Sequence, residues 1–159
     1  MAKHYVNLPV AQPELEALGA LATTEEAGFF ARNPHLVSVY RDRLLAVALC
    51  QGAALQFLGR GYGVNDFDLH FFYAQNPENP RFSRAVKRIW ANVGSFRNVP
   101  VDFVRTVVPK TASQESSSLE RIREFLRARP TSNAWHLSEK AVIGLLPREL
   151  FGATIWPAV

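Results

Sequence analysis

The chain has 159 residues, of which 48% are hydrophobic, and its formal net charge is +4. This length suits a single domain spanning residues 1–159, with N-terminal helices and a C-terminal helical extension around one core. A single cysteine, Cys50, excludes an internal disulfide framework, and the absence of a membrane-length apolar run or an apolar leader favours a cytoplasmic protein without a membrane partner.

Two helices are predicted after a loosely ordered arm of ten residues and before Pro34. Leucines recur at helical spacing after Gln12-Pro13, with the proline in the first helical turn. The run Thr23-Thr24-Glu25-Glu26 predicts the cap and acidic first turn of a second helix, which should end before Pro34. The segment 35–43 is compatible with either a helical turn or an extended edge.

A strand followed by a short helix is predicted next. The apolar run Leu44–Leu49 indicates a buried strand, and Gln51–Leu58 indicates a helix. Gly52 and Ala53 leave the backbone N–H groups at the start of this helix accessible, so that they could bind an anion. The alternative is tight packing between strand and helix without any ligand.

Two aspartates begin the next predicted strand, Asp66–Tyr73. Residues two apart in a strand lie on the same face, so Asp66 and Asp68 are about 7 Å apart along the backbone. Two carboxylates about 6 Å apart repel by roughly 3 kcal/mol at an effective dielectric constant of 20. The neighbouring side chains are apolar, which favours a bound cation such as Mg²⁺. His70 shares this face, either to contact a phosphate or base or as a polar residue deeper in the sheet.

A helix is expected over Arg81–Val93, with Arg81, Arg84 and Arg88 on one outer face. These arginines are either contacts for a phosphate or an acceptor, or part of a solvated face. A later strand, Val99–Val108, carries a third acid, Asp102. Arg105 lies on the opposite face of that strand, so it is not expected to neutralise Asp102.

The remaining third is expected to be mainly helical. Residues 110–118 are serine-rich and indicate a loop, and Leu119–Arg129 has the pattern of an amphipathic helix. Another helix is expected near Thr131–Leu146. The tail Phe151–Trp156 is compatible with either an edge strand or a segment packed on the core.

The order of these features resembles the nucleotidyltransferase superfamily with the polymerase-beta-like fold. The resemblance covers about Leu44–Val108 and rests on Gly52-Ala53, on Asp66-Phe67-Asp68-Leu69 and on Asp102 in a later strand. It implies an α/β fold of the α+β type, with helices packed against a central mixed sheet. It also implies two Mg²⁺ ions at the three aspartates, and phosphate contacts at Gly52 and Ala53. Ala53 departs from the family pattern, which has serine or glycine at this position.

The resemblance implies transfer of a nucleotidyl group from an NTP to an unknown hydroxyl acceptor, with a small molecule, a protein side chain and an RNA end as the alternatives. The departure at Ala53 leaves open a catalytically degenerate member that binds a nucleotide or a partner. A third alternative is a basic module that binds RNA or protein, because residues 1–80 carry a net charge of −3 and residues 81–159 a net charge of +7.

Overall fold

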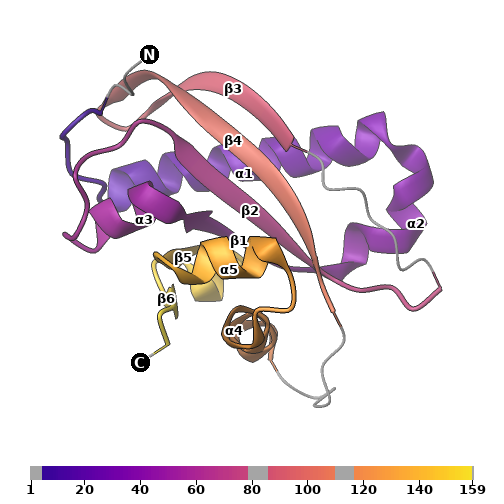
Figure 1. Ribbon diagram of the computed structural model, residues 1–159. Coiled ribbons are helices and arrows are strands. Elements are labelled where there is room, and N and C mark those ends of the chain that lie inside the picture. Colours follow the sequence, from indigo (N-terminus) through magenta and orange to yellow (C-terminus); the bar gives the residue numbers. More distant parts are fainter. Residues whose placement is uncertain (1–4, 79–85, 110–116, 159) are drawn as a thin grey trace.

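The computed structural model describes residues 5–78, 86–109 and 117–158 and has the expected α+β architecture, a mixed six-stranded sheet with helices packed against it (Figure 1). The strands follow the order β3-β4-β2-β1-β5-β6. Their bounds are Leu44–Cys50 (β1), Phe67–Ala74 (β2), Val86–Val93 (β3), Phe96–Val108 (β4), Val142–Leu146 (β5) and Thr154–Trp156 (β6). No helix among the described residues combines the length and the apolar character needed to cross a membrane.

Five α-helices and three short 3-10 turns accompany the sheet in the described ranges. The α-helices are α1 (Gln12–Arg32), α2 (Val37–Tyr40), α3 (Gln51–Phe57), α4 (Ser118–Ala128) and α5 (Ser132–Ser138). The 3-10 turns are η1 (Pro34–Leu36), η2 (Arg41–Arg43) and η3 (Arg148–Leu150). The strand-then-helix succession of β1 and α3 confirms the expectation for residues 44–58.

The central strands β2 and β4 run parallel, whereas the other described strand pairs are antiparallel. Strand β2 is buried on both faces, and its sequence from Phe67 to Ala74 is apolar apart from Asp68 and His70. Strands β3 and β6 lie at the two edges of the sheet. The parallel register brings the first residues of β2 beside the residues in the first half of β4.

The two faces of the sheet contain separate apolar clusters. Phe67, Leu69 and Phe71 of β2 pack in the cluster on the α1 side. Phe72 and Ala74 pack in the other cluster, with apolar residues of α4 and α5. Figure 1 shows α1 along one side of the sheet and α4 and α5 on the other. Alternation along β2 therefore places Asp68 and His70 on the α4–α5 face.

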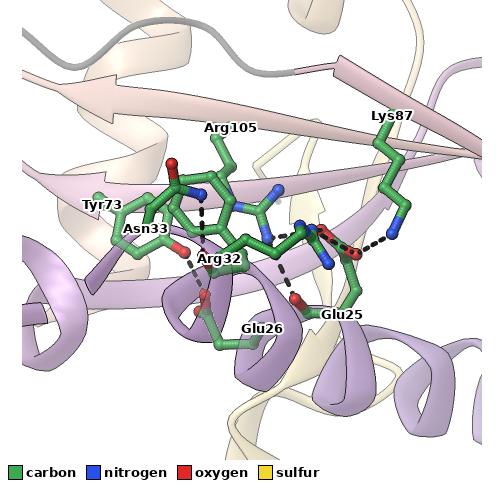
Figure 2. Close-up of polar contacts among 8 residues, drawn as sticks. Glu25, Glu26, Arg32, Asn33, Tyr73, Lys87 and Arg105 are labelled. Atoms are coloured by element: carbon green, nitrogen blue, oxygen red, sulfur yellow. Dashed lines mark hydrogen bonds and ion pairs between the residues drawn. The ribbon is translucent and has the colours of Figure 1, made fainter. Parts of the chain in front are cut away.

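An ionic cluster centred on the buried residues Glu25 and Arg105 connects α1 to the sheet (Figure 2). Glu25 of α1 accepts hydrogen bonds from Arg105 at 3.0 Å, from Lys87 at 3.1 Å and from Arg32 at 3.2 Å. Burial alone would raise the pKa of Glu25, but its three cationic partners lower it below the ordinary value. Arg105, 1% exposed, therefore pairs with Glu25 on the α1 face, in agreement with the expectation that it would not neutralise Asp102.

The expectation of two helices before Pro34 is wrong, because α1 continues through the expected break at Thr23-Thr24. The hydroxyl of Thr23 donates to the carbonyl oxygen of Gly19, one turn earlier, instead of capping a new helix. Glu25 lies within α1 and is buried by the sheet. The end of the helix was anticipated correctly, since α1 stops at Arg32, before Pro34.

The expectation of a helix over Arg81–Val93 is wrong for its described part, because Val86–Val93 is strand β3. This strand pairs antiparallel with β4, and Arg88 lies opposite Asp102. Ile89 and Val93 pack on the apolar cluster of the α1 side, and their spacing of four residues fits one face of a helix as well as one face of a strand. The pairing with β4 stabilises the strand over the helix in this segment. Arg81 and Arg84 lie outside the described residues.

The expectation of a helix near Thr131–Leu146 is also wrong beyond its first half, where α5 ends at Ser138 and β5 begins at Val142. Gly144 of β5 lies against the backbone of Leu150, where a Cβ atom would overlap the carbonyl oxygen. The short strand β6 confirms the edge-strand alternative for the tail. Most of the serine-rich loop, residues 110–116, lies outside the described ranges.

Candidate metal and phosphate site

The three aspartates singled out in the sequence meet at one end of the parallel strand pair. Asp68 of β2 is directly opposite Asp102 of β4, and Asp66 immediately precedes β2. Each of the three can offer one carboxylate oxygen such that all of these oxygens lie within 4.8 Å of one another. Pairing of β2 with β4 thus brings Asp102 next to Asp66 and Asp68, although it is more than thirty residues away in the sequence.

A hollow of about 400 Å³ lies beside this cluster. It is bounded by the start of α3, by the segment that leads into β2, by β2 and β4, and by α5 and the residues after it. Its lining residues are Tyr5, Gln51, Gly52, Asn65, Asp66, Asp68, His70, Val104, Asn133, His136 and Lys140. Asp66 and Asp68 therefore face a space in which a small ligand can lie.

The carboxyl group of Asp68 is the most perturbed member of the cluster. Burial, together with repulsion from Asp66 and Asp102, raises its pKa from 3.8 to about 7, although Arg88 and Lys140 act in the opposite direction. Among the described residues, no hydrogen bond to the Asp68 carboxylate is found. This carboxylate is consequently available to a ligand that brings positive charge.

A protein cation already lies within the cluster. The Nε atom of Arg88 donates to Oδ1 of Asp102 at 2.7 Å, and Nη2 donates to Oδ2 of Asp102 at 2.8 Å. The same Nη2 atom is 3.4 Å from Oδ2 of Asp66. These bonds to Asp102 are the main reason that the pKa of Arg88 is raised. The strand register alone brings this arginine to the acids, since Arg88 and Asp102 are cross-strand neighbours.

The geometry of the cluster fits a small hard cation. Oxygen ligands about 2.1 Å from Mg²⁺ are roughly 3 to 4 Å apart in an octahedral arrangement, and the carboxylate oxygens found here approach that span. The donor set is oxygen only, as Mg²⁺ prefers. The position of the Arg88 guanidinium indicates in addition that the cluster attracts positive charge.

The other expected site residues are divided between the hollow and the core. Gly52 borders the hollow, and a Cβ atom at this position would meet no atom within 4 Å. The side chain of Ala53 instead packs in the apolar cluster on the α1 side, so only its backbone remains for a ligand. His70 borders the hollow but is 4% exposed and stacks on Phe72, in agreement with the deeper of its two expected positions.

Sequence reasoning missed the wall of the hollow opposite the acids. Asn133, His136 and Lys140 lie on α5 or just after it. The amide of Asn133 donates to the hydroxyl of Thr106 in β4 at 2.6 Å, which ties this wall to the sheet. The helical spacing of 133, 136 and 140 was visible in the sequence, but only the packing of α5 on the sheet directs these residues toward the aspartates.

Cys50 is not part of the candidate site. It is fully buried opposite Asp68 in the β1–β2 pair, and burial raises the pKa of its thiol well above the ordinary value. The thiolate form needed for nucleophilic chemistry is therefore disfavoured.

Comparisons of the chain with protein-family models, with curated proteins and with solved structures found no match. What is shown is thus a class of architecture, an α+β domain with an acidic cluster that could bind a metal ion.

Proposed function

We propose that the chain is a nucleotidyltransferase-like domain that binds an NTP together with Mg²⁺ and transfers the nucleotidyl group to a hydroxyl acceptor. The observation that supports this most strongly is the convergence of Asp66, Asp68 and Asp102 within 4.8 Å beside a hollow bordered by Gly52. The proposal includes two Mg²⁺ ions, consistent with three carboxylates that together offer six oxygens.

In this proposal the three aspartates hold the ions, which would supply charge stabilisation for the triphosphate and lower the pKa of the acceptor hydroxyl. The chain contributes the remaining functions. Lys140, on the opposite wall, carries a positive charge toward the phosphates, and Asn133 and His136 add polar groups there. Gly52 leaves the space in front of α3 open, so that phosphate oxygens can approach the backbone.

The test is release of pyrophosphate from each of the four common ribonucleoside triphosphates in the presence of Mg²⁺. The acceptors to be supplied are a panel of small polyols, a mixed RNA pool and the protein itself. We expect metal-dependent release that is lost in Asp68→Asn and in Asp102→Asn. Asp42→Asn is the matched control, because the Asp42 side chain is 94% exposed and distant in sequence from the cluster. Equal release by the wild type and Asp68→Asn would refute the proposal.

The ion pairs of Arg88 favour a second candidate, a catalytically silent member of the same fold that binds a nucleotide or a partner. In that case Arg88 stays hydrogen-bonded to both carboxylate oxygens of Asp102 and neutralises their charge in place of a metal ion. This candidate expects no pyrophosphate release with any acceptor, both in the wild type and in Arg88→Gln. Release by either protein would exclude it.

A further inference from the structure

Arg88 and a divalent cation require the same oxygens. Both carboxylate oxygens of Asp102 accept hydrogen bonds from Arg88, at 2.7 and 2.8 Å, and the guanidinium also reaches Asp66. The arrangement of the guanidinium and Asp102 is a bidentate pair, the strongest geometry for a pair of this kind. A metal ion at Asp102 would lie next to the guanidinium, and repulsion between the two cations opposes binding of the ion while Arg88 is in place.

The surroundings of Arg88 allow it to leave. Its side chain is 48% exposed and belongs to the edge strand β3. The neighbours on the same face of this strand, Val86 and Trp90, are 60% and 61% exposed. The guanidinium thus lies on an exposed stretch of β3, where water can solvate it after it leaves Asp102.

The charge balance of the cluster favours such an exchange. Three carboxylates, those of Asp66, Asp68 and Asp102, surround the single guanidinium of Arg88, and Lys140 borders the same hollow as Asp66 and Asp68. Negative charge therefore remains in excess when Arg88 is in place. A guanidinium released from Asp102 stays tethered to β3 next to the aspartates, and its planar set of donors matches a phosphate group as well as it matches a carboxylate.

We infer that Arg88 is an exchangeable cation: it pairs with Asp102 and Asp66 in the metal-free protein, and it transfers to the phosphates of a nucleotide when divalent ions bind the aspartates. This inference rests on the proposed function and specifies how the site is regulated. Arg88 then opposes binding of the metal alone and favours binding of the metal together with a triphosphate. The site consequently favours the complete metal–nucleotide complex over the free ion.

The test compares two affinities in the full chain, for Mn²⁺ alone and for tripolyphosphate at saturating Mg²⁺. Tripolyphosphate is chosen because it does not depend on the identity of the base. For Arg88→Gln we expect binding of Mn²⁺ to be about 3- to 10-fold tighter than in the wild type, and binding of tripolyphosphate to be about tenfold weaker. Arg97→Gln, an exposed position on β4, is the matched control for the lost charge. Arg88→Lys should lie between the wild type and Arg88→Gln in both measurements.

The exchange predicts opposite changes in the affinities for Mn²⁺ and for tripolyphosphate. A variant that fails to fold would lose both affinities. If Arg88→Gln binds Mn²⁺ no more tightly than the wild type and Arg97→Gln, or if its affinity for tripolyphosphate is unchanged, the exchange is refuted while the metal site remains. If neither the wild type nor Arg88→Gln binds Mn²⁺, the proposed function itself fails and the exchange fails with it.

Discussion

Asp68 on β2 and Asp102 on β4 are direct neighbours in the parallel register of the two strands. Like charges opposite each other in a sheet are destabilising unless a cation or a proton compensates them. Arg88 compensates Asp102, whereas burial, together with repulsion from Asp66 and Asp102, raises the pKa of Asp68. The excess of negative charge at this cluster should make the stability of the protein depend on pH and on divalent metal.

The stability of the metal-free protein should depend on the protonation of Asp68. A carboxyl group whose pKa is raised from 3.8 to about 7 on folding binds its proton more tightly in the folded state. Stability is therefore lost as the pH rises from about 4 through 7. In the presence of a chelator, Asp68→Asn should stabilise the protein by roughly 1 kcal/mol more at pH 8 than at pH 5. This magnitude is reduced to take account of solvent screening.

Urea unfolding at the two pH values measures this difference. Asp42→Asn should show none, because the Asp42 side chain is 94% exposed. The comparison between variants cancels the contributions of Glu25 and Glu26, whose pKa values are shifted in opposite directions. An equal effect of Asp68→Asn at both pH values would contradict the raised pKa.

Divalent metal should stabilise the folded protein through the same cluster. At a free Mn²⁺ concentration about a hundred times the Kd, the expected gain is about 2.7 kcal/mol, because the ion binds only the folded state. Thermal unfolding with and without Mn²⁺ measures it. The gain should vanish in Asp68→Asn and Asp102→Asn and persist in Asp42→Asn. A gain that survives both cluster variants would place the ion elsewhere.

The buried partners Glu25 and Arg105 should not be equivalent. Glu25→Gln leaves Arg105, 1% exposed, without a carboxylate, and the expected cost is about 3 to 5 kcal/mol. Arg105→Met leaves Glu25 with Lys87 and Arg32 and retains apolar contact with the ring of Phe29, so its expected cost is about 2 kcal/mol.

Denaturant unfolding of the two single variants checks this order. The control is Glu16→Gln, which removes an exposed ion pair with Arg148 and should change stability by less than about 1 kcal/mol. A smaller loss for Glu25→Gln than for Arg105→Met would show that the cluster is not organised around Glu25.

Two glycines should respond oppositely to alanine. Gly144→Ala introduces a Cβ atom against the backbone of Leu150 and should destabilise the protein by about 1 to 3 kcal/mol. Gly19→Ala, in the interior of α1 with nothing within 4 Å of the added atom, should stabilise it by about 0.5 to 1 kcal/mol. Thermal unfolding distinguishes the two. A stabilising Gly144→Ala would instead support a helix over residues 131–146.

Several local features could be read from the sequence because they depend on neighbours in the chain. The strands around Leu44 and Asp66 are long apolar runs, and α4 has a clear amphipathic pattern. The C-terminal stop of α1 follows from Pro34. Where local preference and tertiary pairing disagreed, as over Val86–Val93, the sequence pattern alone predicted the wrong element.

The sequence by itself determined which residue types were present for the candidate site: three aspartates, two of them separated by one residue at the start of a strand, and a glycine at the start of a short helix. Only the tertiary structure decided that Asp102 joins the other two, that Arg88 lies among them and that α5 forms the opposite wall. The physical reason is that strand register and helix packing are set by burial across the whole sheet, and the spacing of residues along the chain does not encode such contacts.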